Sequence, residues 1–217
     1  MADDSGHIDD SDKASIHPWW LRMIHWFNAT AIVLLIMSGW RIYDGTNFLH
    51  FFTPDGRGGL VRGFPHNLTL GGWLGGALQW HFAAMWILFA TTLIYLVMVV
   101  VTRRFGRQFL PLSFTGIFRD LWATFTGKLS HADIRHYNFV QKTAYLFAML
   151  DIVVLILSGL VLFKSVQFPI LRTLLGGYET ARYIHFIAMT LMVAFILVHM
   201  VMAFLVPKTI KAMLWGR

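Results

Sequence analysis

Four of the ten histidines in this 217-residue chain lie inside or at the edge of long apolar stretches. They are His25, His81, His185 and His199. Ionisable side chains at membrane depth are costly and are usually functional, and a neutral imidazole is a common ligand of iron and other transition metals. These four residues are therefore the first candidates for metal ligands. The other histidines fall in expected tails and loops, where we expect solvated or interfacial side chains.

The spacing of the last two candidates is informative. His185 and His199 are 14 residues apart in one apolar stretch. On a helix this spacing places both side chains within about 40° of the same face and about 21 Å apart along the axis. The sequence therefore predicts ligands at two separate levels of one helix.

The surrounding sequence is typical of a membrane protein. Charged residues make up only 13% of the chain and hydrophobic residues 57%, whereas a soluble domain carries about 25% charged residues. A spanning helix needs about 20 apolar residues, and we expect four spans, at 23–40, 78–101, 143–163 and 183–206. These runs are too long for barrel strands. The prediction is an all-α, integral membrane four-helix bundle over residues 18–217, preceded by a disordered acidic tail at 1–17.

The basic residues predict the direction of the spans. With the N-terminus in the cytoplasm, twelve of the eighteen Lys and Arg residues fall on the cytoplasmic side, as the positive-inside rule requires. We therefore expect a multi-pass protein of the bacterial inner membrane with both termini cytoplasmic. This direction places His25 level with His199 near the cytoplasmic side, and His81 level with His185 near the outer side.

Two level pairs of histidines favour haem over other metal groups. A bis-imidazole haem takes one ring from each of two facing helices, and bundle cores build cofactor sites in this way. Cysteine is absent, which excludes thiolate ligands, iron–sulfur clusters and covalent c-type attachment. A structural zinc site would gather three or four ligands at one depth. We therefore predict two haems, one for each pair.

Four further residues are candidates for contacts with these haems. Gly39 and Gly159 are expected at the outer level, where a glycine either gives a flat ring room or allows close helix packing. Arg22 and Arg182 each come three residues before a candidate ligand. They either pair with anionic haem propionates or extend to the membrane surface. Both readings stay open for each residue.

The connections carry their own expectations. Residues 41–77 are rich in Gly, Pro and Asn and predict a folded outer loop, whereas 165–182 predict a short outer turn. Residues 103–142 contain an apolar stripe that predicts an amphipathic inner-surface helix between the second and third spans. Asp151, about midway along the third span, is either a proton relay or a packing residue.

Several motifs resemble one family. They are RMIHWFNA around His25, GGALQWHFAAMW around His81, RYIHF and LVHM around the last pair, LSG at 157–159 and YNFVQK at 137–142. From about residue 17 to 210 the chain resembles the bacterial cytochrome b561-type membrane subunits, which include the cytochrome b subunits of nickel–iron hydrogenases and the gamma subunit of respiratory formate dehydrogenase. The resemblance implies two b-type haems and a quinone site beside the inner one, with Asn138 and Gln141 as quinone contacts. An alternative role for these two amides is capping a helix.

The expected function is electron transfer between membrane quinone and an extracytoplasmic oxidoreductase partner, with a molybdopterin enzyme as one candidate. The expected partners also include membrane lipid but not nucleic acid. An alternative is a free-standing superoxide:quinone oxidoreductase, as some members of the family are. A third hypothesis is a transporter that uses intramembrane histidines, although the broken-helix repeats of many carriers are missing.

Overall fold

A computed structural model of the chain describes residues 18–46, 52–54, 60–102 and 139–216, without the side chains of 46, 52–54, 60–62 and 139–142. The four long helices are α1 (Trp19–Thr46), α2 (Leu74–Val101), α5 (Phe139–Phe163) and α7 (Tyr178–Leu205). Each is long and apolar enough to cross a membrane. Their surfaces expose many large apolar side chains, as lipid-facing helices do. The predicted four-helix membrane bundle is confirmed.

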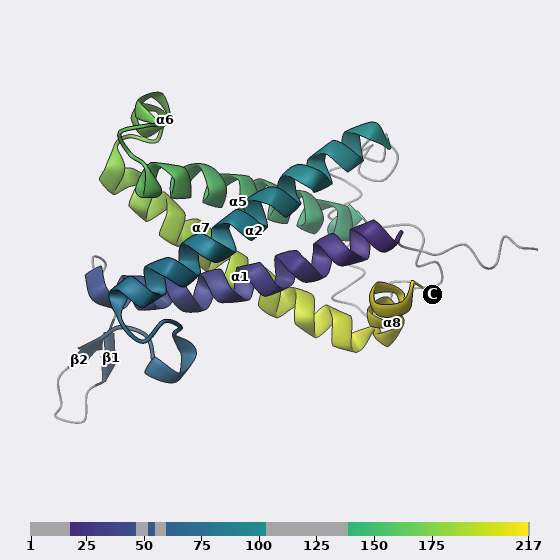
Figure 1. Cartoon of the computed structure of the whole chain (residues 1–217). Coiled ribbons are helices and arrows are strands. Elements are labelled where there is room, and N and C mark those ends of the chain that lie inside the picture. Colours follow the sequence, from purple (N-terminus) through teal and green to yellow (C-terminus); the bar gives the residue numbers. More distant parts are fainter. Residues whose placement is uncertain (1–17, 47–51, 55–59, 103–138, 217) are drawn as a thin grey trace, which may run out of the picture.

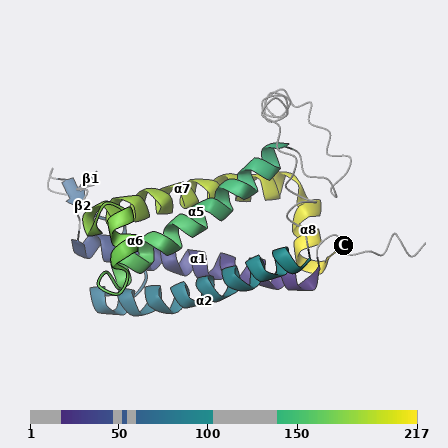
Figure 2. The same ribbon diagram turned by 90° about the horizontal axis from the view of Figure 1, so that it is seen from above.

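The long helices form two layers (Figure 2). The backbones of α1 and α2 approach closely, and so do those of α5 and α7, whereas close backbone approach between the layers is sparse among the described residues. Successive helices run in opposite directions. The loop between α1 and α2 and the short helix α6 (Pro169–Leu174) lie at one end of the bundle, and helix α8 (Pro207–Trp215) lies at the other (Figure 1).

Small residues allow the close approach within each layer. Ala77 and Ala84 are almost fully buried on α2, and Ala181 and Ala188 are almost fully buried on α7. Small side chains at helix interfaces let two backbones approach in the absence of a hydrophobic driving force between them. In both helices a candidate histidine follows the first alanine by four residues and precedes the second by three. The two layers therefore repeat one local pattern.

The helices extend beyond the predicted spans. The expected outer turn contains α6 and then Gly176 and Gly177, whose positive φ angles of 75° and 97° favour glycine. Helix α7 ends at Leu205, and Pro207 begins α8. Helix α8, which the sequence analysis did not predict, ends at Gly216 in the left-handed conformation, a common helix terminus. Most of the predicted amphipathic helix at 103–142, and the tail at 1–17, lie outside the described residues.

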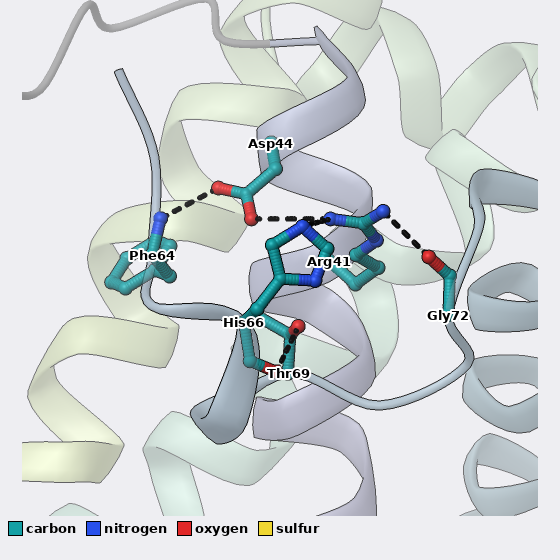
Figure 3. Close-up of polar contacts among 6 residues, drawn as sticks. All are labelled: Arg41, Asp44, Phe64, His66, Thr69 and Gly72. Carbon is teal, nitrogen blue, oxygen red and sulfur yellow. Dashed lines mark hydrogen bonds and ion pairs between the residues drawn. The ribbon is translucent and has the colours of Figure 1, made fainter. Parts of the chain in front are cut away.

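The outer loop is folded onto the end of α1. It contains a two-stranded antiparallel hairpin, β1 (Phe52–Pro54) and β2 (Leu60–Arg62), and a 3-10 turn η2 (His66–Leu68). Arg41 on α1 donates to the Gly72 carbonyl oxygen at 2.5 Å and lies 3.1 Å from His66 Nε2 (Figure 3). Asp44, one turn later, accepts the Phe64 backbone N–H at 2.7 Å. These contacts fix the loop beside the outer ends of the helices.

Candidate functional site: two histidine pairs across the bundle

The four candidate histidines meet in two pairs. The ring centroids of His81 on α2 and His185 on α7 lie 6.4 Å apart. Those of His25 on α1 and His199 on α7 lie 6.2 Å apart. Each pair takes one ring from each layer, so both pairs lie at the interface between the layers. The structure therefore brings together the same residues that the sequence predicted to be level.

The spacing of the rings fits a metal between them. A ligating histidine nitrogen lies about 2 Å from its metal and about 1 Å from its own ring centroid, so two rings on opposite sides of one metal have centroids about 6 Å apart. Both observed distances agree with this value. The described residues contain no group of three or more His, Cys, Asp or Glu side chains that could hold a metal ion. Two imidazoles at each level would hold the iron of a porphyrin, which supplies the other ligands itself.

A serine hydroxyl contacts each ring of the His81–His185 pair, which we call the outer pair after its predicted level in the membrane. His25 and His199 are the inner pair. Ser38 Oγ lies 3.0 Å from His81 Nδ1, and Ser158 Oγ lies 2.9 Å from His185 Nδ1. Both serines are fully buried, one on α1 and the other on α5. Each layer thus supplies its histidine with a hydrogen-bond partner from the neighbouring helix.

The glycine after each serine allows this approach. A Cβ atom at Gly39 would lie 3.4 Å from His81 Cε1, and one at Gly159 would lie 3.3 Å from His185 Cε1. A Cβ atom alone would touch the ring, so a side chain that extends beyond Cβ at either position would press on the imidazole. The contact seen at both predicted glycines is close packing against a histidine ring. Their contact with a haem stays a prediction.

Aromatic rings surround the inner pair. Trp26 meets His25 edge-on, with ring centroids 5.2 Å apart. Phe195, one turn before His199, lies nearly parallel to its ring at 5.7 Å. Each histidine of the inner pair thus contacts an aromatic ring.

The two predicted arginines have protein partners. Arg22 Nη1 donates to the Leu214 carbonyl oxygen of α8 at 3.0 Å. Arg182 forms an ion pair with Glu179, one turn earlier on α7. The pairing of the two arginines with haem propionates stays a prediction.

Three other polar candidates are less well defined by the structure. Asn138 lies outside the described residues. Gln141 lies in the first turns of α5, but its side chain is outside the described part of the chain. Asp151 is buried on α5, and its Oδ2 atom has no hydrogen-bond partner among the described residues.

Ser38 is the residue that the sequence analysis missed. The signal that could have found it is the repeated Ser-Gly step, at 38–39 and again at 158–159. The sequence analysis used Gly39 from the first step for its depth alone, and Ser158 only as part of a family motif. Alignment of residues 38–39 with 158–159 would have matched the two serines as well as the two glycines.

Comparison with known proteins agrees with this arrangement. Residues 16–216 match the family described as prokaryotic cytochrome b561. The chain is also 56% identical over 202 residues to a protein of Azospira oryzae named "Putative protein-methionine-sulfoxide reductase subunit YedZ1", covering 93% of this chain and 96% of the relative. Together with four spanning helices and histidines paired across them, these matches show that the chain belongs to the prokaryotic cytochrome b561 family of membrane proteins.

Proposed function

We propose that this protein is a dihaem cytochrome b subunit that carries electrons between a membrane quinone and an extracytoplasmic oxidoreductase. The observation that supports it most is the pair of histidine couples at two levels of the bundle, each joining the two layers. Membership of the family implies binding of haem b. When bound, the haem iron supplies reversible one-electron chemistry.

In this proposal the chain sets the positions of two ligand couples. His185 and His199 are separated along α7 by about 21 Å of helix rise. The facing helices α2 and α1 supply His81 and His25 as the second ligands. Because the four rings come from long packed helices rather than loops, their spacing is fixed by the fold, which favours a constant path for electrons across the membrane.

The proposed quinone site lies at the cytoplasmic side. Gln141 lies in the first turn of α5, at the end of the bundle where α7 reaches His199, and Asn138 comes directly before Phe139 in the sequence. An amide side chain there can donate a hydrogen bond to a quinone carbonyl oxygen. Water at the membrane surface can exchange the protons that quinone reduction or quinol oxidation requires.

The proposed partner is a reductase of methionine sulfoxide in proteins, because the Azospira oryzae relative is named as a subunit of such an enzyme. Reduction of a sulfoxide to a thioether consumes two electrons and two protons and releases water. A membrane subunit that takes electrons from quinol can supply both electrons one at a time. A molybdopterin cofactor in that partner is part of the proposal.

The test is reduction of the purified chain by quinol in lipid nanodiscs. Oxidised protein mixed with excess quinol should develop the reduced b-type absorbance bands, and oxidised quinone should discharge dithionite-reduced protein. Gln141→Ala should slow both reactions, whereas Gln167→Ala, an exposed amide near the opposite end of α5, should not. Failure of quinol and quinone to react with the wild-type chain would reject the proposal. Reduction by superoxide but not by quinol would instead favour the superoxide-oxidising alternative.

A further inference from the structure

We propose that Ser38 and Ser158 are positioning residues for the outer histidine pair. They fix which nitrogen of each imidazole carries the hydrogen, and they lower the reduction potential of the haem held there. This inference rests on the proposed function, because it requires His81 and His185 to ligate a haem. It adds a role for two buried hydroxyls that distinguishes the outer site from the inner one.

The direction of each hydrogen bond follows from counting hydrogens. Ser38 Oγ lies 2.6 Å from the Leu34 carbonyl oxygen, and Ser158 Oγ lies 2.6 Å from the Val154 carbonyl oxygen. A carbonyl oxygen only accepts, so the single hydroxyl hydrogen of each serine is donated to the preceding turn of its own helix. The serine oxygen can then only accept from the imidazole.

The histidine nitrogen that faces each serine must therefore carry a hydrogen. Nδ1–H of His81 donates to Ser38 Oγ at 3.0 Å, and Nδ1–H of His185 donates to Ser158 Oγ at 2.9 Å. A neutral imidazole has one N–H, so Nε2 keeps its lone pair in both rings. Nε2 is then the nitrogen available to a metal between the layers. Histidine ligands commonly have their other N–H held by an acceptor in this way.

The same device is built twice. Both serines are completely buried, each is followed by a glycine, and each glycine lies against the Cε1 atom of the ring that the serine holds. The two histidines occupy matching positions between buried alanines on α2 and α7. Two copies of one arrangement, in two layers with different surrounding sequences, indicate a shared requirement of the two rings.

The inner site lacks this arrangement on at least one side. The ring of His199 lies against Phe195, and no hydrogen bond to it is found among the described residues. An imidazole whose N–H donates a hydrogen bond to an oxygen is a stronger electron donor to its metal. Stronger donation favours the ferric state of the iron. The serines should therefore hold the outer haem at a lower potential than it would have without them.

The experiment is a redox titration of purified holoprotein carrying Ser38→Ala, Ser158→Ala or both, with EPR spectra of the ferric haems and haem content measured in parallel. The outer component is the one that His81→Ala removes. Ser38→Thr and Ser158→Thr keep a hydroxyl that can bond the preceding turn. Thr190→Ala is the matched control. Thr190 also lies on a spanning helix, and it donates to the Phe186 carbonyl oxygen, in the preceding turn, at 2.9 Å. No hydrogen bond from Thr190 to a histidine is found among the described residues.

Each alanine variant should move the potential of the outer component to more positive values and change its EPR g values, and the double variant should move it further. The inner component and the Thr190→Ala protein should not move, and threonine should restore the wild-type potential. Loss of the outer haem in the alanine variants that threonine restores would support the same role. An unmoved outer potential, an equal shift of both components, or a haem loss that threonine does not restore would overturn the inference while leaving the proposed function intact. A wild-type chain without an outer haem would instead reject the proposed function.

Discussion

Two adjacent residues of α1 contact one imidazole in different ways. Ser38 bonds Nδ1 of His81, and Gly39 leaves space for Cε1 of the same ring. On α5 the corresponding pair holds His185. Because a Cβ atom would already touch each ring, a side chain larger than that of alanine at either glycine would displace the imidazole.

We predict that Gly159→Leu removes the outer haem. A Cβ atom alone would lie 3.3 Å from His185 Cε1, so the larger side chain must displace the ring, and displaced ligands bind poorly. Haem content should fall from about two to about one per chain, and Gly159→Ala should have a much smaller effect. Ala83→Leu, at an exposed position two residues from His81, is the control and should keep both haems. Full haem content in Gly159→Leu would contradict the proposed site.

The residue scale also shows what the sequence could predict. The levels of the four histidines followed from helix rise and direction, which depend only on position in the chain. The partner of Ser38 did not follow, because it depends on how α1 and α2 are rotated against each other. Hydroxyls that bond their own helix are ordinary in spanning helices, so Ser38 carried no signal by itself.

At the scale of elements, α8 lies at the same end of the bundle as the start of α1 (Figure 1). It begins at Pro207. Near its end, the Leu214 carbonyl oxygen accepts from Arg22 of α1 at 3.0 Å, and the Met213 carbonyl oxygen lies 3.4 Å from Trp26 Nε1. A cation at the carbonyl end of a helix is stabilising. Trp26 also contacts His25, so α8 is joined to the inner pair through one side chain.

We predict that Arg22→Ala loosens α8. Loss of the bond to Leu214 should cost about 1 kcal/mol of local stability, so the backbone amides of α8 should exchange hydrogen about five-fold faster. Hydrogen exchange followed by mass spectrometry measures this change. Lys211→Ala, on α8 itself, is the control and should leave the exchange of its neighbours nearly unchanged. Equal exchange in wild type and Arg22→Ala would show that the contact does not hold α8.

The sequence did not reveal α8 because the helix has only nine residues. A short helix gives too few turns for a periodic pattern to stand out. The predicted span ends at residue 206, one residue after the end of α7 at Leu205. That Pro207 begins a helix depends on the docking site that Arg22 offers, which is remote in the chain.

At the scale of the whole molecule, two helix pairs repeat one pattern and meet through their histidines. The prediction of four spans followed from composition and length. Composition and length could not predict the pairing of α1 with α2 and of α5 with α7. That pairing depends on small residues that meet at the helix interfaces.

The direction of the bundle in the membrane is a prediction from the basic residues. The chain has no cysteine, so single introduced cysteines can be labelled without background. Thr173→Cys on α6 should react with an impermeant maleimide in intact cells, whereas Lys211→Cys on α8 should react only after the membrane is opened. The reverse pattern would invert the protein and place the proposed quinone site on the outer side.

The central claim is that two imidazole couples hold two separate haems. Pyridine haemochrome quantification of the wild-type chain and its four single His→Ala variants tests it most directly. The account predicts about two haems in the wild type and about one in each variant. His25→Ala and His199→Ala should both keep the spectrum of the outer haem. His81→Ala and His185→Ala should both keep the spectrum of the inner haem. A single haem in the wild type, or shared loss between His25 and His81, would contradict it.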